Sequence, residues 1–184
     1  MTKKFNSVLI IGMGLIGSSI SRALIANNVV NNVYGLDSDD KVIKKCQNLN
    51  LFIRGETNLS NFDLQFDLII ICTPLSMYKK IFLDLNTFIS QPTIVTDVGS
   101  TKMSTITDYN KIKSNANISF IPSHPIAGLE KSGPEFGLSN LFENRYCILT
   151  PFLQDNKSLE TVSEMWKSIG MTIEIMDAER HDRV

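Results

Sequence analysis

The segment GMGLIG has the spacing G-x-G-x-x-G, a pattern that can bring a protein backbone close to phosphate groups. In this pattern Gly12 permits a tight turn, Gly14 leaves room for a pyrophosphate, and Gly17 lets a helix pack close to a strand. The spacing alone is weak, because glycines also mark ordinary turns. Here it follows the apolar run SVLII and precedes a segment with helical spacing. We therefore expect the N–H groups of Leu15 and Ile16 to begin a helix that faces phosphates.

Asp37 lies twenty residues after Gly17, at the end of an expected second strand. Its carboxylate can accept hydrogen bonds from both ribose hydroxyls of an adenosine, and it would repel a 2′-phosphate. No arginine follows in residues 38–41, which read SDDK. The sequence therefore favours NAD over NADP as the cofactor. The alternative is that Asp37 or Ser38 only caps the following helix.

The chain has two histidines, and one of them, His124, lies in the segment SHPIAGLEKSG, residues 123–133. We expect this segment on a loop that runs from residue 122 to about residue 144, after a strand at residues 118–121. That placement brings His124 to the same rim as the glycine turn, because the carboxyl ends of parallel strands share one edge. A neutral imidazole there can accept the proton of an alcohol whose carbon gives up a hydride. A structural or solvated histidine is the alternative.

Apolar runs that alternate with helical spacing predict the elements that must position these residues. Strands are expected at residues 7–11, 32–37, 66–72, 93–98 and 118–121, with helices at 15–26, 39–48, 76–89 and 102–113. Two more strands are expected at 145–150 and 171–176, with a helix between them whose apolar stripe includes Trp166 as a core residue. The pattern predicts an α/β protein with a Rossmann-type, doubly wound and mainly parallel sheet.

Two further turns are expected to line the groove of the same cofactor. Thr73 and Pro74 follow the third predicted strand, and Gly99 follows the fourth. Ligands of open parallel sheets bind beyond these strand ends. The alternatives are that Thr73 and Ser76 cap the next helix, and that the turn at Gly99 is a plain connection with a serine cap.

Composition limits the class of protein. The chain has 184 residues, of which 43% are hydrophobic and 20% charged, and its net charge is −1. These values are typical of one globular domain and give no sign of binding to nucleic acid or to an anionic membrane. Three cysteines lie far apart, at positions 46, 72 and 147, so we expect neither a disulfide framework nor a metal site. Free cysteines are typical of a protein in the reducing cytoplasm, which is where we expect this one.

The N-terminus carries a weak likeness to a signal peptide, since Lys3 and Lys4 precede an apolar run. Three glycines interrupt that run, and the helical segment that follows contains Arg22, which argues against secretion. No apolar stretch approaches the length of about 18 residues that a membrane span needs. We therefore expect no membrane partner.

The sequence resembles the prephenate and arogenate dehydrogenase family of tyrosine biosynthesis. The matching segments, in family order, are GMGLIGSSISRAL (12–24), Asp37, CTP (72–74), TDVGSTK (96–102), SHPIAGLEKSG (123–133) and AERHDRV (178–184). DVGSTK and HPIAGxExSG are much more specific than G-x-G-x-x-G, because other dinucleotide-binding families lack the combination. The resemblance extends over nearly the whole chain.

The resemblance implies an NAD-dependent oxidative decarboxylation of prephenate to 4-hydroxyphenylpyruvate, or of arogenate to tyrosine. His124 matches the family's catalytic histidine and would accept the hydroxyl proton of the cyclohexadienol. Ser100 matches the serine of the GS-x-K motif and would bond the reacting hydroxyl or orient His124. Lys102 and Glu130 are expected to organise the substrate pocket, with a solvated surface role as the alternative. His181 is expected to line the pocket or to lie on the surface at a helix start.

The resemblance also implies a domain organisation. Residues 1–176 correspond to the dinucleotide-binding domain, and residues 177–184 begin the connection to a helical dimerisation domain that has no counterpart in this sequence. A truncated chain is the simplest expectation, and a naturally short protein is the alternative. The whole protein is expected to be a homodimer. Two alternative functions remain. One is another dehydrogenase or an imine reductase with the same glycine turn, and the other is an NAD-binding module without catalysis.

Overall fold

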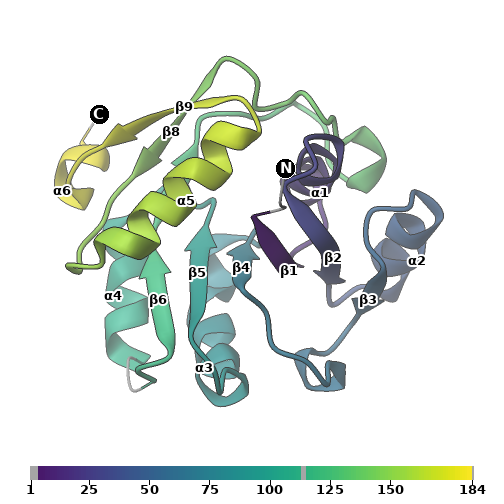
Figure 1. Ribbon diagram of the computed structural model, residues 1–184, viewed down its shortest axis with the longest axis horizontal. Helices are drawn as coiled ribbons and strands as arrows, with labels where there is room; N and C mark the ends of the chain where they lie inside the picture. The colour runs from purple at the N-terminus through teal and green to yellow at the C-terminus, as the bar shows by residue number, and fades with distance from the viewer. Residues whose placement is uncertain (1–3, 113–114, 184) are drawn as a thin grey trace.

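Six parallel strands form the main sheet of the computed structural model, which describes residues 4–112 and 115–183 (Figure 1). The strands are β1 (Phe5–Ile11), β2 (Val30–Leu36), β3 (Arg54–Glu56), β4 (Leu68–Ile71), β5 (Thr93–Asp97) and β6 (Ile118–Ile121). Their order is β3-β2-β1-β4-β5-β6, so the chain adds strands on one side of β1 first and then continues with β4 on its other side. Dinucleotides bind at this change of order in doubly wound sheets. The predicted fold class is confirmed. Lys3, residue 113 and Val184, which belong to predicted segments, lie outside the described residues.

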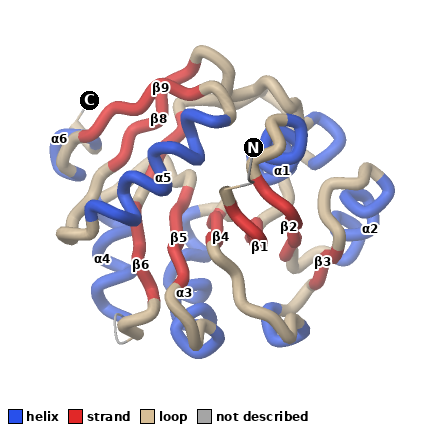
Figure 2. The backbone as a smooth tube through the Cα atoms, viewed as in Figure 1, coloured by secondary structure: helices blue, strands red, loops and turns tan. Residues whose placement is uncertain are grey.

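Helices cover both faces of this sheet, as Figure 2 shows in blue and red. The helices are α1 (Leu15–Ala26), α2 (Asp40–Asn48), α3 (Tyr78–Phe88), α4 (Met103–Ile112), α5 (Asn156–Ser168) and α6 (Ala178–His181), with short 3₁₀ turns at Leu59–Asn61, Leu75–Met77 and Pro134–Phe136. Side chains of α1 and α5 pack on one face, and those of α3 and α4 on the other. Within the described residues, no helix is long and apolar enough to cross a membrane.

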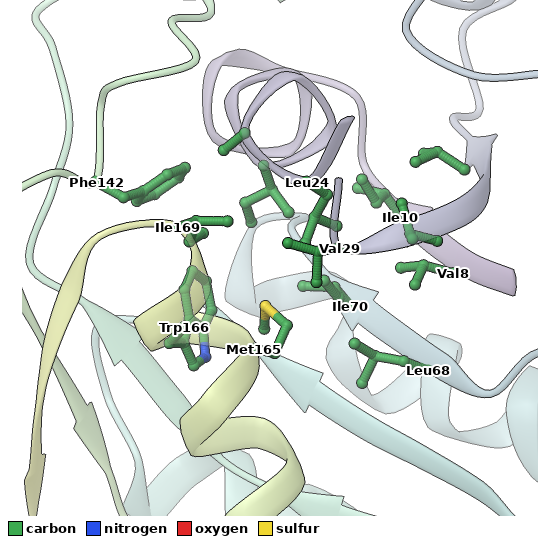
Figure 3. Close-up of a cluster of buried hydrophobic side chains, with 14 of the residues drawn as sticks. Val8, Ile10, Leu24, Val29, Leu68, Ile70, Phe142, Met165, Trp166 and Ile169 are labelled. Carbon is green, nitrogen blue, oxygen red and sulfur yellow. The ribbon is translucent and has the colours of Figure 1, made fainter. Parts of the chain in front are cut away.

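The core between the sheet and α5 explains the apolar stripe on that helix. Figure 3 shows Trp166 and Met165 facing the buried side chains of the main sheet. Trp166 is fully buried and meets Phe142 edge to face, with ring centroids 5.8 Å apart. The prediction of a core role for Trp166 is confirmed.

A second, three-stranded sheet lies next to the first and corrects one prediction. It consists of β7 (Ser123–Pro125), β8 (Arg145–Leu149) and β9 (Met171–Ile175), in that order. β7 runs antiparallel to β8, with His124 opposite Ile148. The start of the segment that was expected to be a loop is therefore a strand, because β8 supplies the hydrogen-bond partner that a three-residue strand needs. His124 is thus held by its pairing with β8, and it lies three residues after the end of β6.

Candidate active site

The glycine turn after β1 has the geometry that its spacing predicts. Gly12 has a positive φ of +94°, and a Cβ there would lie 2.8 Å from the carbonyl of Cys72. A Cβ on Gly17 would lie 2.0 Å from the carbonyl oxygen of Gly12, so only glycine allows α1 to approach the strand this closely. A Cβ on Gly14 would meet no atom within 4 Å. The turn is therefore tight on its protein side and open on the side where a phosphate group would approach.

The N-terminus of α1 is free to bind an anion. Gly14 occupies the N-cap position, and no side chain caps the helix or places an acidic group in its first turn. The first N–H groups of an α-helix have no partner within the helix, and they carry a partial positive charge. Leu15 and Ile16 begin this helix, as predicted. With no capping side chain in the way, these N–H groups are available to a phosphate group.

A cavity of about 560 Å³ lies at the carboxyl ends of β1, β2 and β4. It brings together five of the predicted cofactor residues: Gly12, Gly14, Asp37, Thr73 and Pro74. The other four, Leu15, Ile16, Gly17 and Gly99, are not part of its lining.

Most of the other residues that line this cavity were not predicted from the sequence. The additional lining residues are Ile11, Leu36, Ser38, Thr57, Asn58, Leu59, Cys72, Met77, Lys80, Ile81 and Asp84. Among these residues, Cys72 belongs to the CTP motif (72–74). Thr57, Asn58 and Leu59 follow β3, whose sequence RGE has no apolar pattern that would mark a strand. The residues from α3 were readable only as part of an amphipathic helix.

Asp37 lies at the end of β2 and anchors the glycine turn. One carboxylate oxygen accepts a hydrogen bond from the backbone N–H of Met13 (2.9 Å), and the other accepts from the N–H of Asp39 (3.0 Å). Asp39, rather than Asp37 or Ser38, caps α2 through the N–H of Lys41. A carboxylate offers about four acceptor positions, so two remain for ribose hydroxyls.

Thr73 gives an independent sign that a ligand belongs in the cavity. Its hydroxyl oxygen is buried and has no hydrogen-bond partner among the described residues. It does not cap the turn that follows, whose N-cap is Pro74. Buried hydroxyl groups nearly always have a partner, so this oxygen fits a polar group of a bound dinucleotide.

A buried ion pair fixes the residue that precedes the candidate base. The amine of Lys102 lies 2.6 Å from a carboxylate oxygen of Asp97, and both side chains are fully buried. The pair holds the backbone of Ser123 from both sides: Asp97 accepts from its N–H (2.9 Å), and Lys102 donates to its carbonyl (2.7 Å). The indole N–H of Trp166 donates to the Ser123 hydroxyl at 3.2 Å. These bonds leave the backbone at His124 little freedom to move.

His124 makes contact with the other histidine of the chain. Its Nδ1 lies 2.9 Å from Nε2 of His181, and Nδ1 of His181 lies 2.7 Å from a carboxylate oxygen of Asp182. Asp182 in turn accepts hydrogen bonds from the N–H groups of Lys102 and Met103, at the start of α4. A row of three side chains therefore leads from the N-terminus of α4 to the ring of His124.

Of the remaining predicted site residues, His181 belongs to this row, whereas Ser100 and Glu130 make no hydrogen bond to it. Ser100 is exposed, and its hydroxyl makes no hydrogen bond within the described ranges, so the expected bond to His124 is not seen. Glu130 is exposed on the loop after β7. Lys102 is fully buried, which excludes the solvated surface role. It contacts Asp97 and the backbone of Ser123 rather than lining a pocket. His181 is buried, at 6% exposure, so it lies behind His124.

The surroundings of His124 keep its ring neutral. Its pKa is lowered from 6.5 to about 4, mainly by burial, then by the charge of Lys102 and by His181, while Asp97 and Asp182 act in the opposite direction. An imidazole with this pKa carries a free lone pair at neutral pH and can accept a proton.

We expect the ¹⁵N NMR signals of His124 to titrate near pH 4 rather than near 6.5. Because the folded-state pKa is below the unfolded one, the ring contributes stability above about pH 6.5 that is lost as the pH falls toward 4. A Lys102→Met variant that remains folded should shift the midpoint upward, since it removes a nearby positive charge. A midpoint near 6.5 in the unaltered chain would contradict the described environment.

Known proteins resemble this chain in sequence and in fold. Residues 20–175 match the family model described as "Prephenate dehydrogenase, nucleotide-binding domain". The chain is 32% identical to a cyclohexadienyl dehydrogenase of Zymomonas mobilis over 98% of its own length and 61% of that protein, and 32% identical to a prephenate dehydrogenase of Lactococcus lactis over 96% and 48%.

A solved structure agrees with these sequence matches. The prephenate dehydrogenase of A. aeolicus, in complex with hydroxyphenyl propionate and NAD⁺, superposes with a TM-score of 0.91 at 32% identity. The match covers 99% of this chain and 63% of that one. The chain thus spans about half to two-thirds of the length of these relatives. Because the family model covers most of the chain, from within α1 to the end of β9, the chain belongs to the prephenate dehydrogenase family and contains its nucleotide-binding domain.

Proposed function

We propose that this chain supplies the cofactor site and the catalytic base of an NAD-dependent prephenate dehydrogenase, which converts prephenate to 4-hydroxyphenylpyruvate. One observation carries the proposal. A neutral, half-buried imidazole, His124, follows β6 at the same edge of the sheet as the cavity with the glycine turn. The family match and the A. aeolicus structure that contains NAD⁺ support the choice of cofactor and of substrate class.

NAD, when bound, supplies the acceptor for the hydride. The N-terminus of α1 and the open side of Gly14 would hold its pyrophosphate, and Asp37 would accept from the ribose hydroxyls. The carboxylate at this position disfavours a 2′-phosphate, and within the cavity lining the cation Lys80 is already paired with Asp84 at 2.7 Å. These features support NAD over NADP.

His124 would take the hydroxyl proton of the substrate as the carbon that carries this hydroxyl loses its hydride. The ring carboxylate then leaves as CO₂, its bonding electrons complete the aromatic ring, and the phenolate oxygen that results takes a proton back to give 4-hydroxyphenylpyruvate. Formation of the aromatic ring supplies much of the driving force. The protein therefore has to orient the substrate, accept one proton and exclude water. Ser100 stays a candidate for a hydrogen bond to the same hydroxyl.

The test is formation of NADH at 340 nm by the whole protein, with prephenate and with arogenate in separate reactions. Turnover with prephenate and release of 4-hydroxyphenylpyruvate are expected. Preference for arogenate would favour the alternative that the Zymomonas cyclohexadienyl dehydrogenase suggests. Binding of NAD without turnover of either compound would indicate a non-catalytic module and overturn the proposal.

Two glycine variants should separate cofactor binding from folding. Gly14→Ala is expected to leave the melting temperature unchanged but to weaken NAD binding at least about tenfold, which corresponds to about 1.4 kcal/mol, because its methyl group enters the open side of the turn. Gly17→Ala should instead destabilise the fold by about 1–3 kcal/mol, because its Cβ collides with backbone.

Calorimetric titration and thermal unfolding measure the two effects. Gly128→Ala is the control, because a Cβ on Gly128 also meets no atom within 4 Å but Gly128 lies outside the cavity. Equal NAD affinity of the Gly14→Ala and Gly128→Ala variants would contradict the proposed position of the pyrophosphate.

We also propose that the whole protein acts as a homodimer in the cytoplasm. The support is the resemblance to the family, whose helical domain supplies a dimer interface. Light scattering of the purified whole protein measures its mass in solution and would contradict the proposal if it gave the mass of a single chain.

A further inference from the structure

The contacts behind His124 determine which of its nitrogens carries the hydrogen. They begin with Asp182, whose carboxylate is held in place by two backbone donors, the N–H groups of Lys102 (2.8 Å) and Met103 (2.9 Å). These two residues lie 80 and 79 positions earlier in the chain, so the carboxylate is fixed by tertiary structure rather than by its own helix. Burial raises the pKa of Asp182, but hydrogen bonds from Lys102, His181 and Met103 outweigh it and keep the pKa below the ordinary value. The group is therefore an ionised acceptor.

An ionised carboxylate can only accept hydrogen bonds. Because Asp182 lies 2.7 Å from Nδ1 of His181, this nitrogen must carry the hydrogen. In the neutral form of His181 the lone pair is then on Nε2, which lies 2.9 Å from Nδ1 of His124. That nitrogen of His124 must in turn be the donor. The only lone pair left on the neutral ring of His124 is on Nε2.

We propose that His181 and Asp182 are positioning residues that hold His124 as the Nδ1–H tautomer, so that its Nε2 is the atom that accepts the substrate proton. The catalytic consequence rests on the proposed function, whereas the tautomer itself does not. When Nε2 takes the proton, the Nδ1–H of the new imidazolium still points to His181. The negative charge of Asp182, two rings away, then stabilises the positive charge that has formed.

The two rings come from distant parts of the chain, which makes their contact specific. His124 lies on β7 and His181 ends α6, 57 residues later. The rings meet edge to face, with centroids 5.1 Å apart and an interplanar angle of 69°, and the two facing nitrogens lie within hydrogen-bond distance, at 2.9 Å. Burial of His181, at 6% exposure, protects this hydrogen bond from competition by water.

The chain is well suited to a direct test, because it contains only two histidines. Long-range ¹H–¹⁵N correlation spectra of the ¹⁵N-labelled chain at pH 7 should show two imidazole rings, each protonated at Nδ1. In His181→Leu, His124 loses its acceptor and should become a mixture of both tautomers. In His181→Gln, the side-chain amide oxygen can accept the same hydrogen bond and should restore the Nδ1–H form.

The kinetic test uses the whole protein with NAD and its better substrate. His181→Leu should lower kcat at least about tenfold, but by less than the roughly 10⁴-fold loss that follows when a histidine base is locked in the wrong tautomer. The KM for NAD should stay unchanged, and His181→Gln should recover most of the lost kcat. Arg180→Leu, at the exposed neighbouring position of α6, is the control and should behave like the unaltered protein.

The outcomes separate this inference from the proposed function. No turnover by the unaltered protein refutes the function, while the NMR spectra still decide the tautomer. An Nε2–H signal for His124 in the unaltered chain would mean that His181 is the donor, and it would overturn the inference. Unchanged spectra and kcat in His181→Leu would overturn it as well.

Discussion

Replacing His124 with asparagine is expected to lower the rate of NADH formation by about 10²- to 10⁴-fold, the usual contribution of a general base. Asparagine has a polar group near the position of Nδ1 and can still bond to His181, but it has no atom that corresponds to Nε2. Proton acceptance is therefore lost while the second sheet keeps its structure. Steady-state kinetics of the whole protein measure the effect.

The same variant should bind NAD as tightly as the unaltered protein, because His124 is not part of the lining of the nucleotide cavity. Its melting temperature should change little, since the backbone bonds of Ser123 remain. A rate that falls less than about threefold would exclude His124 as the base. A parallel loss of NAD affinity would indicate that the change disturbs the cofactor site instead.

Lys102→Met is expected to destabilise the fold by about 3–5 kcal/mol, because it leaves the carboxylate of Asp97 buried without its partner. Both side chains of this pair have 0% exposure, and water cannot take the place of the lysine. For a domain of this size the loss corresponds to a fall in melting temperature of about 6–20 °C. Thermal or urea unfolding monitored by circular dichroism measures it.

Lys44→Met is the matched control. Lys44 also pairs with an aspartate, Asp40, at 2.5 Å, but its side chain is 72% exposed, so the change should leave the melting temperature nearly unchanged. Adding Asp97→Asn to Lys102→Met removes the unpaired charge and should recover part of the stability. Equal stability of the Lys102→Met and Lys44→Met variants would show that the buried pair does not stabilise the fold.

Much of the main sheet could be predicted, because its elements have strong local patterns. The bounds of α1 (Leu15–Ala26) and β6 (Ile118–Ile121) match the prediction residue for residue. α1 begins after a glycine turn, and β6, with the sequence ISFI, lies between Asn117 and Pro122, so each carries its own boundary signals. The five predicted cofactor residues that line the cavity follow from the same rule, since they all come after parallel strands.

The elements that were missed have no local signal. β3, with the sequence RGE, pairs only with β2 at the sheet edge, and β7 contains a proline in three residues. The burial of Lys102 was also beyond prediction, because lysine is almost never fully buried unless it is paired. Its partner, Asp97, is part of the motif TDVGSTK, which gives no sign of an ion pair.

The contact between the two histidines depends on tertiary structure alone. His181 was a candidate for the pocket because of the AERHDRV motif, but nothing in the sequence places its ring against His124, 57 residues away. Such distant pairs are set by how the second sheet packs on the first. Side chains that act through another side chain are therefore harder to predict than those that bind a cofactor at a strand end.

The bond from Asp182 back to the start of α4 has a consequence for the order in which the protein is made. During synthesis all six parallel strands have left the ribosome by residue 121, whereas α5, which covers one face of their sheet, emerges later. The residues that line the nucleotide cavity have all emerged by Asp84. The histidine pair forms only after residue 182 has emerged and folded back onto α4. The residues that line the cavity are therefore all synthesised well before the residues that contact the ring of His124.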